Sequence, residues 1–260
     1  MTEKRFSFLN NISDEESILL SNVLSWAEVA NEKHFSKFSF FLDERQQELC
    51  KRALASQKLD NYKFWGGFDE ATRKVIGLFP NDEKLDADDY PVKSLRFTFR
   101  KEDKLTHRNF LGTLMSLQIE RKCVGDILVG EGSANVIVVD SVADRVLDEI
   151  FKVGGVGVKC AIGFDKSIKA EFKTETINGT VASLRADCLF SLAARLSREK
   201  AASLIKMRGI SIEHMLTYRP DTRIEQGQSF SVKGFGKFIL RSVYGVSKKD
   251  RIRVELCKFI

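Results

Sequence analysis

The sequence predicts an α+β protein with a separate basic α/β module at its C-terminal end. Three observations predict this: capped helical periodicity in the first sixty residues, a later alternation of strands and helices, and an excess of Lys and Arg confined to the last eighty residues. The 260 residues are 43% hydrophobic and 30% charged, which is typical of a globular protein with room for two or three domains. We expect domains at residues 1–90, 91–178 and 179–260.

The first expected domain is mostly helical and contains one hairpin. A capping box beginning at Ser13 precedes apolar residues at helical spacing, and Asp43 is a suitable cap for a second helix. Residues 62–68, rich in aromatic side chains, and residues 74–79 then predict the two strands of the hairpin. The acidic stretch 82–89 is the expected boundary of this domain.

The second expected domain has elements in the order β-α-β-β-α-β, which is the ferredoxin-like pattern. Its expected parts are a strand from Ser94, a helix capped by Thr106, strands at 126–129 and 135–139, a helix from Asp140 or Ser141, and a strand at 158–164. The RNA-recognition motif (RRM) shares this pattern and stacks bases on aromatic residues of two central strands. Here the first strand offers Phe97 and Phe99, but the strand at 135–139 has no aromatic residue. The two phenylalanines are therefore either core residues or a residual RNA contact.

Several classes of protein are excluded by composition. No apolar run approaches the eighteen residues of a membrane helix, and residues 1–8 lack the apolar segment of a secretory signal, so we expect a cytoplasmic protein that contacts no membrane. The five cysteines occur singly and in odd number, which argues against a disulfide framework and favours reduced core residues. With three isolated histidines, neither a metal site nor a cofactor is expected.

The charge of the chain is unevenly placed. Residues 181–260 contain 16 Lys and Arg against 7 Asp and Glu, whereas residues 1–180 contain 26 against 29. A basic segment on a near-neutral body is typical of nucleic-acid binding, because phosphate neutralisation supplies most of the sequence-independent affinity. The alternative is an ordinary solvated basic face.

Motifs in the basic segment give it a more specific interpretation. They are Arg185-Ala186-Asp187, Leu196-Ser197-Arg198, Gly209-Ile210-Ser211-Ile212, Gly227-Gln228-Ser229-Phe230-Ser231-Val232 and Lys233-Gly234-Phe235-Gly236-Lys237. Together they resemble the S-four domain, an RNA-binding module named after the fourth protein of the small ribosomal subunit. The pair Glu213-His214 departs from the family, which commonly has an asparagine there, so the usual turn chemistry is in question.

The resemblance extends upstream and is to the YlmH family. It is carried by Phe41-Leu42-Asp43-Glu44-Arg45-Gln46-Gln47, Trp65-Gly66-Gly67-Phe68, the segment 105–112, and the segment 119–128. It implies three parts: a helical N-terminal domain, an RRM-like centre and a terminal S-four domain. It also implies a monomeric, non-catalytic bacterial protein that associates with ribosomal RNA of the large subunit and with tRNA or peptidyl-tRNA. The implied role is ribosome-associated quality control of stalled nascent chains.

The candidate RNA-binding residues all lie in the last domain. Arg198 ranks first, because it follows a capping serine at a helix N-terminus, where phosphate also meets free N–H groups and a favourable dipole. Asp187 is expected to be an ion-pair partner that orients Arg185 or Arg198. Phe235, between two glycines, either exposes its ring for stacking or packs beneath its loop. The full set is Arg185, Ser197, Arg198, Lys206, Arg208, Lys233, Phe235, Lys237, Arg241, Lys248, Lys249 and Arg251.

Two other interpretations remain open. S-four domains are also appended to RNA-modifying enzymes such as pseudouridine synthases and methyltransferases, although residues 1–180 contain no convincing catalytic motif. Alternatively, residues 1–180 mainly bind protein, and the RNA-binding domain serves as a tether.

Overall fold

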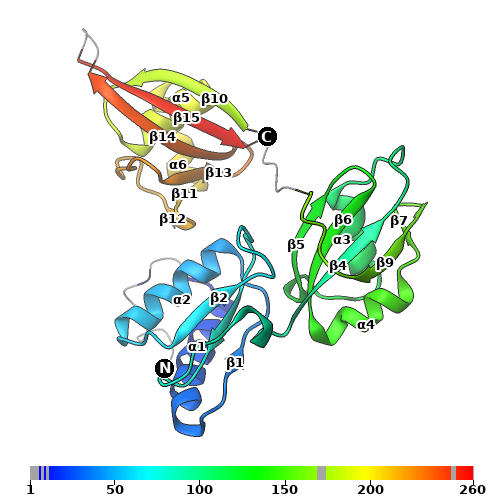
Figure 1. Ribbon diagram of the computed structural model, residues 1–260. Helices are drawn as coiled ribbons and strands as arrows, with labels where there is room; N and C mark the ends of the chain where they lie inside the picture. Colours follow the sequence, from blue (N-terminus) through cyan, green and yellow to red (C-terminus); the bar gives the residue numbers. More distant parts are fainter. Residues whose placement is uncertain (1–5, 7–8, 10–11, 169–173, 247–249, 260) are drawn as a thin grey trace. The chain divides into compact units, whose positions relative to one another are not determined.

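The computed structural model describes Phe6, Leu9 and residues 12–168, 174–246 and 250–259. The chain divides into two compact units, whose main described parts are residues 13–168 and 174–259 (Figure 1). The structure is a mixture of helices and sheets, so the predicted α+β class is confirmed. None of the described helices is both long and apolar enough to cross a membrane.

The first unit begins with two capped helices and a small sheet. Its elements are α1 (Asp14–Lys33), β1 (Lys37–Phe38), α2 (Glu44–Ser56), β2 (Tyr62–Trp65), β3 (Val75–Leu78) and the 3-10 turn η1 (Ala87–Asp89). Capping boxes at Ser13 and Asp43 fix the starts of α1 and α2, as the sequence predicts. The predicted hairpin is also confirmed, since β2 and β3 pair antiparallel, and β1 adds a short third strand beside β3.

A second sheet follows in the same unit. Its elements are β4 (Val92–Thr98), α3 (His107–Ser116), the 3-10 turn η2 (Arg121–Cys123), β5 (Val124–Val129), β6 (Ser133–Val139), α4 (Asp140–Glu149), the small hairpin β7 (Lys152–Val153) and β8 (Val156–Gly157), and β9 (Lys159–Ile162). The strands pair antiparallel in the order β5-β6-β4-β9. Phe97 of β4 is fully buried, and its ring meets Phe110 of α3 edge-on at 5.3 Å. Phe97 is therefore a core residue on the helix side of the sheet.

One hydrophobic core joins the two sheets of this unit. Phe41, Leu85 and Tyr90 belong to the same buried cluster as the strands of the second sheet. Asp126 of β5 reinforces the junction, because its carboxylate accepts hydrogen bonds from the Thr72 N–H at 2.5 Å and the Thr72 hydroxyl at 2.6 Å. Leu85 and Tyr90, at the expected domain boundary, thus belong to a shared core, which explains why residues 13–168 form one compact unit.

The face of the second sheet opposite its helices is largely covered. Val92, Ser94 and Ile137 point to that face, and a Cβ placed on Gly67 would come within 2.7 Å of Ile137 Cγ2. Asn135 lies on the same face, where its side chain exchanges two hydrogen bonds with the backbone of Asp165. The chain's own loops therefore occupy much of the surface on which an RRM stacks bases, whereas Arg96 and Ala161 remain exposed on it.

We expect Gly67→Ala to destabilise the protein by roughly 1–3 kcal/mol, because the backbone φ of +92° disfavours a side chain and Ile137 blocks the new methyl group. Urea unfolding of both variants measures the effect. Gly155→Ala is the matched control, since Gly155 also has a positive φ, +85°, but no atom within 4 Å of a new Cβ. Equal losses for the two variants would show that Gly67 does not pack tightly on the sheet.

The second unit places two helices on one face of a six-stranded antiparallel sheet (Figure 1). Its elements are β10 (Thr174–Val181), α5 (Ala186–Ala194), α6 (Arg198–Arg208), β11 (Ile210–Ile212), β12 (Met215–Thr217), β13 (Ser229–Val232), β14 (Gly236–Val246) and β15 (Ile252–Phe259). The strand order is β10-β15-β14-β13-β11-β12. Strand β10 crosses the expected domain boundary at residue 179 and pairs with β15 along its whole length.

The unusual pair Glu213-His214 forms a tight turn between β11 and β12. Both residues have positive φ, 46° and 64°, as a two-residue hairpin turn of type I′ requires. The Glu213 carboxylate also accepts a hydrogen bond from the backbone N–H of Ser229. That bond ties the turn to β13, so the turn forms without the asparagine that is common in S-four domains.

Candidate nucleic-acid interface

Asp187 is the centre of a cluster of charged side chains at the start of the two helices of the second unit. It is buried, with 3% of its surface exposed, and it lies in the first turn of α5. Its Oδ1 accepts from Arg185 Nε at 3.1 Å, and its Oδ2 accepts from Arg198 Nε at 2.9 Å. The expectation that Asp187 orients these arginines is confirmed, and the carboxylate holds both of them.

The two guanidinium groups remain accessible while they are held. The side chains of Arg185 and Arg198 are 41% and 53% exposed, against 4% for that of Asp187. Arg198 donates to Asp187 through its Nε, and its Nη groups donate to no residue in the described part of the chain. A planar guanidinium fixed at one edge can still present two N–H donors to phosphate oxygens.

The N-terminus of α6 lies beside this cluster. Ser197 caps the helix, and its hydroxyl accepts from the Lys200 N–H at 3.2 Å, as the sequence predicts. The remaining free N–H groups of the first turn and the helix dipole favour an anion there. Arg198 is the first residue of α6, so its side chain and the helix end serve the same region.

Protonation of Asp187 should weaken this arrangement in acid. Burial raises the pKa of Asp187, but the hydrogen bonds from Arg185 and Arg198 outweigh burial and leave the pKa below its usual value. The contribution to stability is therefore complete above a pH of about 4 and is lost as the pH falls through the lowered pKa. Unfolding free energies measured between pH 5 and pH 2 should converge for the wild type and Asp187→Asn. A difference between the two proteins that stays constant from pH 5 to pH 2 would contradict a stabilising role of the ionised Asp187 carboxylate.

Two arginines that sequence analysis did not select lie beside the cluster. Arg223 forms an isolated antiparallel bridge with Arg185, so their side chains leave the backbone on the same side. Arg219 donates a hydrogen bond to Asp221 at 3.3 Å, and this bond lowers the pKa of Asp221. The positive charge of Arg185 lowers the same pKa further. The segment 219–224 has no periodic pattern, and only its pairing with residues 184–187 reveals its position. We call Arg185, Asp187, Arg198 and Arg223 the arginine cluster.

A second group of selected residues lies at the far end of α6. Lys206 and Arg208 are exposed in the last turn, about 15 Å along the helix from Arg198. Arg208 reaches the turn between β13 and β14, where its Nη1 would lie 3.7 Å from a Cβ on Gly234. Lys233 is exposed in that same turn. Lys206, Arg208 and Lys233 therefore form one group of cations, which is separate from the arginine cluster.

The remaining selected cations lie on the sheet. Lys237 Nζ is 5.7 Å from the centre of the Phe259 ring, and Arg241 is 3.5 Å from Glu255. The Arg251 guanidinium donates to the carbonyl of Thr180 at 2.8 Å. Lys248 and Lys249 fall outside the described residues. The structure thus distributes the described residues of the predicted set over three places.

Phe235 packs against the core of its unit. Its ring meets Phe190 of α5 edge-on, with 5.1 Å between ring centres, and the residue is half-buried. The alternative in which Phe235 packs beneath its loop is therefore the one that the structure favours. One side of the residue nevertheless lines a cleft, in which Glu175, Arg195 and Lys258 also lie.

Comparison with known proteins matches the chain to a family of domains, to a relative of similar length and to a shorter solved structure. Residues 86–163 match the family described as a putative RNA-binding domain in YlmH. Over 248 residues the chain is 29% identical to the ribosome-associated protein quality control protein P2 of Bacillus subtilis (strain 168), covering 92% of this chain and 94% of that protein. The solved structure of the cell division protein ylmH from Streptococcus pneumoniae matches with a TM-score of 0.51 and 19% identity. That match covers 59% of this chain and 94% of the solved one, and it shows a shared fold.

Proposed function

Because the resemblance of this chain to the YlmH family is confirmed, we propose that it is a non-catalytic RNA-binding factor of the ribosome. In this proposal it binds ribosomal RNA of the large subunit together with tRNA or peptidyl-tRNA, in the cytoplasm and as a monomer. Its role is quality control of stalled nascent chains, and the name of the Bacillus subtilis relative, a ribosome-associated protein quality control protein, supports the quality-control part. The observation that carries the RNA-binding part is the arginine cluster, in which one buried carboxylate aims two accessible guanidinium groups.

The cluster suits a phosphate better than it suits an acidic side chain of a partner protein. Two arginines of the cluster pair with one buried carboxylate, and the third, Arg223, forms a backbone bridge with Arg185. The N-terminus of α6 adds free N–H donors beside them. Phosphate offers several oxygens in one compact group, which a guanidinium engages in pairs. The excess of basic residues in 181–260 supplies the surrounding attraction.

The fold supports finer assignments in the same proposal. The antiparallel strand order β5-β6-β4-β9, with helices after the first and third strands in the chain, supports an RRM-like middle domain at 91–178. The helices α5 and α6 followed by a small sheet support an S-four-type domain at 179–260, and residues 1–90 form the N-terminal domain. Since much of the open face of the second sheet is covered, we place the main RNA contact in the last domain.

We expect the protein to co-sediment with large ribosomal subunits and to be released by salt. Each phosphate that the arginine cluster neutralises releases counterions, so the logarithm of affinity falls by about 0.7–0.9 per contact for each tenfold rise in salt. Sedimentation through sucrose gradients over a series of KCl concentrations measures this. Association that persists at high salt would contradict binding through phosphate contacts.

The rival function is that of an RNA-modifying enzyme with an appended RNA-binding domain, for example a pseudouridine synthase or a methyltransferase. The two functions differ in turnover, because a binding factor consumes neither a base, a methyl donor nor a nucleotide. We expect the purified protein, incubated with ribosomal RNA and tRNA, to leave modified nucleosides at background in mass spectrometry. Enzymatic accumulation of any modified nucleoside would replace the proposed function with the rival.

A further inference from the structure

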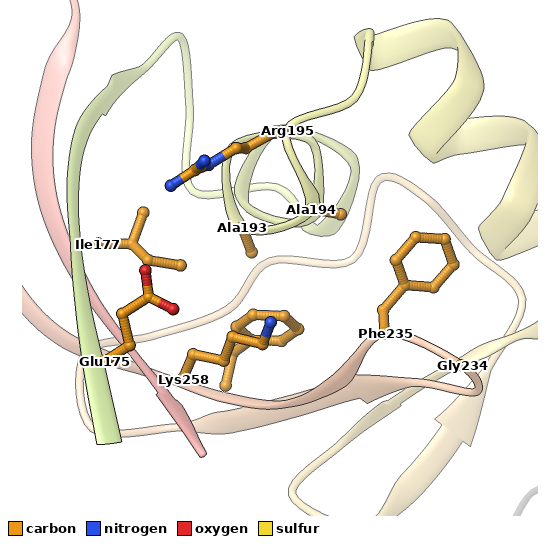
Figure 2. A pocket seen from close by; sticks show the side chains of 9 residues that line it. Glu175, Ile177, Ala193, Ala194, Arg195, Gly234, Phe235 and Lys258 are labelled. Atoms are coloured by element: carbon orange, nitrogen blue, oxygen red, sulfur yellow. The ribbon is translucent and has the colours of Figure 1, made fainter. Parts of the chain in front are cut away.

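A cleft of about 360 Å³ lies in the second unit, where the helix layer ends above the sheet (Figure 2). Its volume falls in the range of small-ligand pockets. The apolar part of the lining consists of Ile177, Ala193, Ala194, Phe235 and Phe238. Gly234 belongs to the lining as well and contributes no side chain beside the Phe235 ring.

Polar atoms supply most of the accessible surface of the cleft, and three charged side chains lie around its smaller apolar part. Glu175, Lys258 and Phe238 sit at one level on three neighbouring strands, because Lys258 of β15 pairs with both Glu175 of β10 and Phe238 of β14. Arg195 comes from the opposite side, at the C-terminal cap of α5, and Figure 2 shows it across the cleft from Lys258. None of the three charged groups makes a hydrogen bond or ion pair with any residue in the described part of the chain.

The charged side chains and the smaller apolar surface together indicate the chemistry of the ligand. The Phe235 ring and the apolar side chains complement a flat, apolar group. Arg195 and Lys258 complement a phosphate, and Glu175 complements an amino group that donates a hydrogen bond. A nucleotide combines these features, and stacking of a base on an aromatic ring stabilises single-stranded binding. A carboxylate accepts from the amino group of cytosine but meets the carbonyl oxygen of uracil unfavourably.

We propose that this cleft binds one unpaired RNA nucleotide, with preference for cytidine over uridine. The base lies against Phe235, Glu175 accepts from its amino group, and Arg195 and Lys258 meet its phosphate. Arg195 and Arg198 are the two ends of the turn between α5 and α6, so an RNA strand held at the arginine cluster runs on toward the cleft. This site rests on the proposed RNA-binding function and adds to it a place where a base is distinguished.

The test compares RNA hairpins that end bluntly with the same hairpins carrying a single-stranded cytidine or uridine extension at either end. Dissociation constants come from fluorescence anisotropy at one fixed salt concentration. For the wild type, a cytidine extension should tighten binding roughly tenfold, by stacking and phosphate contact together. A uridine extension should tighten binding about fivefold less than a cytidine extension does, since uracil lacks the amino group that contacts Glu175.

Variants separate the contributions of the three kinds of side chain. Arg195→Ala and Phe235→Leu should each reduce the gain from an extension, and Glu175→Gln should abolish the preference for cytidine, because an amide both donates and accepts. Arg253→Ala is the matched control: Arg253 is exposed on β15 but points to the other face of the sheet from Lys258. It should leave the gain from the extension unchanged. Glu175 and Arg195 are exposed, so these variants test the site even if Phe235→Leu disturbs folding.

The outcomes distinguish this inference from the proposed function. If the blunt hairpin binds and Arg198→Ala weakens it, but extensions add nothing in the wild type, the cleft is no nucleotide site and the RNA-binding function stands. If extensions help equally in Arg195→Ala, Glu175→Gln and the wild type, the unpaired nucleotide binds elsewhere and the inference is overturned. If no RNA binds at all, both the function and this site are wrong.

Discussion

Arg198→Ala is expected to weaken RNA binding by roughly 1.5–3 kcal/mol, the usual worth of a hydrogen bond to a charged group. The physical reason is that Arg198 is held by Asp187 through Nε, while its half-exposed guanidinium keeps its Nη donors for phosphate at the N-terminus of α6. The salt dependence should also flatten by about one unit, because one phosphate contact is removed. Filter binding or anisotropy with ribosomal RNA fragments over a salt series measures both quantities.

Two further variants make this result specific. Arg198→Lys should recover only part of the affinity, because the charge returns but the planar fork, with its separate edge for Asp187, does not. Arg145→Ala should change little, since Arg145 is exposed on α4 and pairs with Glu149 one turn away. If Arg198→Ala unfolded the second unit while the folded fraction kept its affinity for RNA, the arginine would be structural instead.

Asp187→Asn is expected to weaken RNA binding by roughly 1–3 kcal/mol, although it removes a negative charge from a surface that binds phosphate. The buried carboxylate accepts from Arg185, from Arg198 and from the backbone N–H of Cys188. An asparagine keeps one acceptor but lacks the charge that holds two guanidinium groups, so both arginines lose their fixed direction. The free energy of unfolding should fall by about 1–2 kcal/mol, a moderate loss because both arginines are half-exposed.

The sign of the effect on RNA affinity decides between two accounts of the arginine cluster. If arginines act only as diffuse positive charge, the variant gains one net positive charge and should bind RNA more tightly, most visibly at low salt. If their direction matters, binding weakens at every salt concentration. Glu199→Gln is the matched control, because it removes an exposed negative charge from the first turn of α6 and leaves the Asp187 contacts in place. It should tighten binding slightly in either account.

Much of the fold could be predicted because local signals agree with the final contacts. The capping boxes at Ser13 and Asp43, the hairpin of β2 and β3, and the alternation around Phe97 all depend on residues within a few positions of one another. Strand β10 was not predicted, and its composition explains why. It is an exposed edge strand of mostly polar residues, and only its pairing with β15, about eighty residues later, identifies it.

The same distinction applies to the candidate site. Ser197 and Arg198 could be selected from sequence because a cap and the residue after it are neighbours in the chain. Arg223, Arg195 and Lys258 could not, since their positions depend on pairing and on where α5 ends above the sheet. Nor could the sequence reveal that Gly67 and Asp165 cover the open face of the second sheet, because those contacts join segments far apart in the chain.

Crosslinking in living cells, followed by sequencing of the bound RNA, tests the central claim most directly. The wild type should enrich ribosomal RNA of the large subunit and tRNA, and Arg198→Ala expressed at the same level should lose most of that enrichment. Enrichment confined to messenger RNA, or equal recovery of large-subunit RNA with the variant, would contradict an RNA-binding function exercised through the arginine cluster.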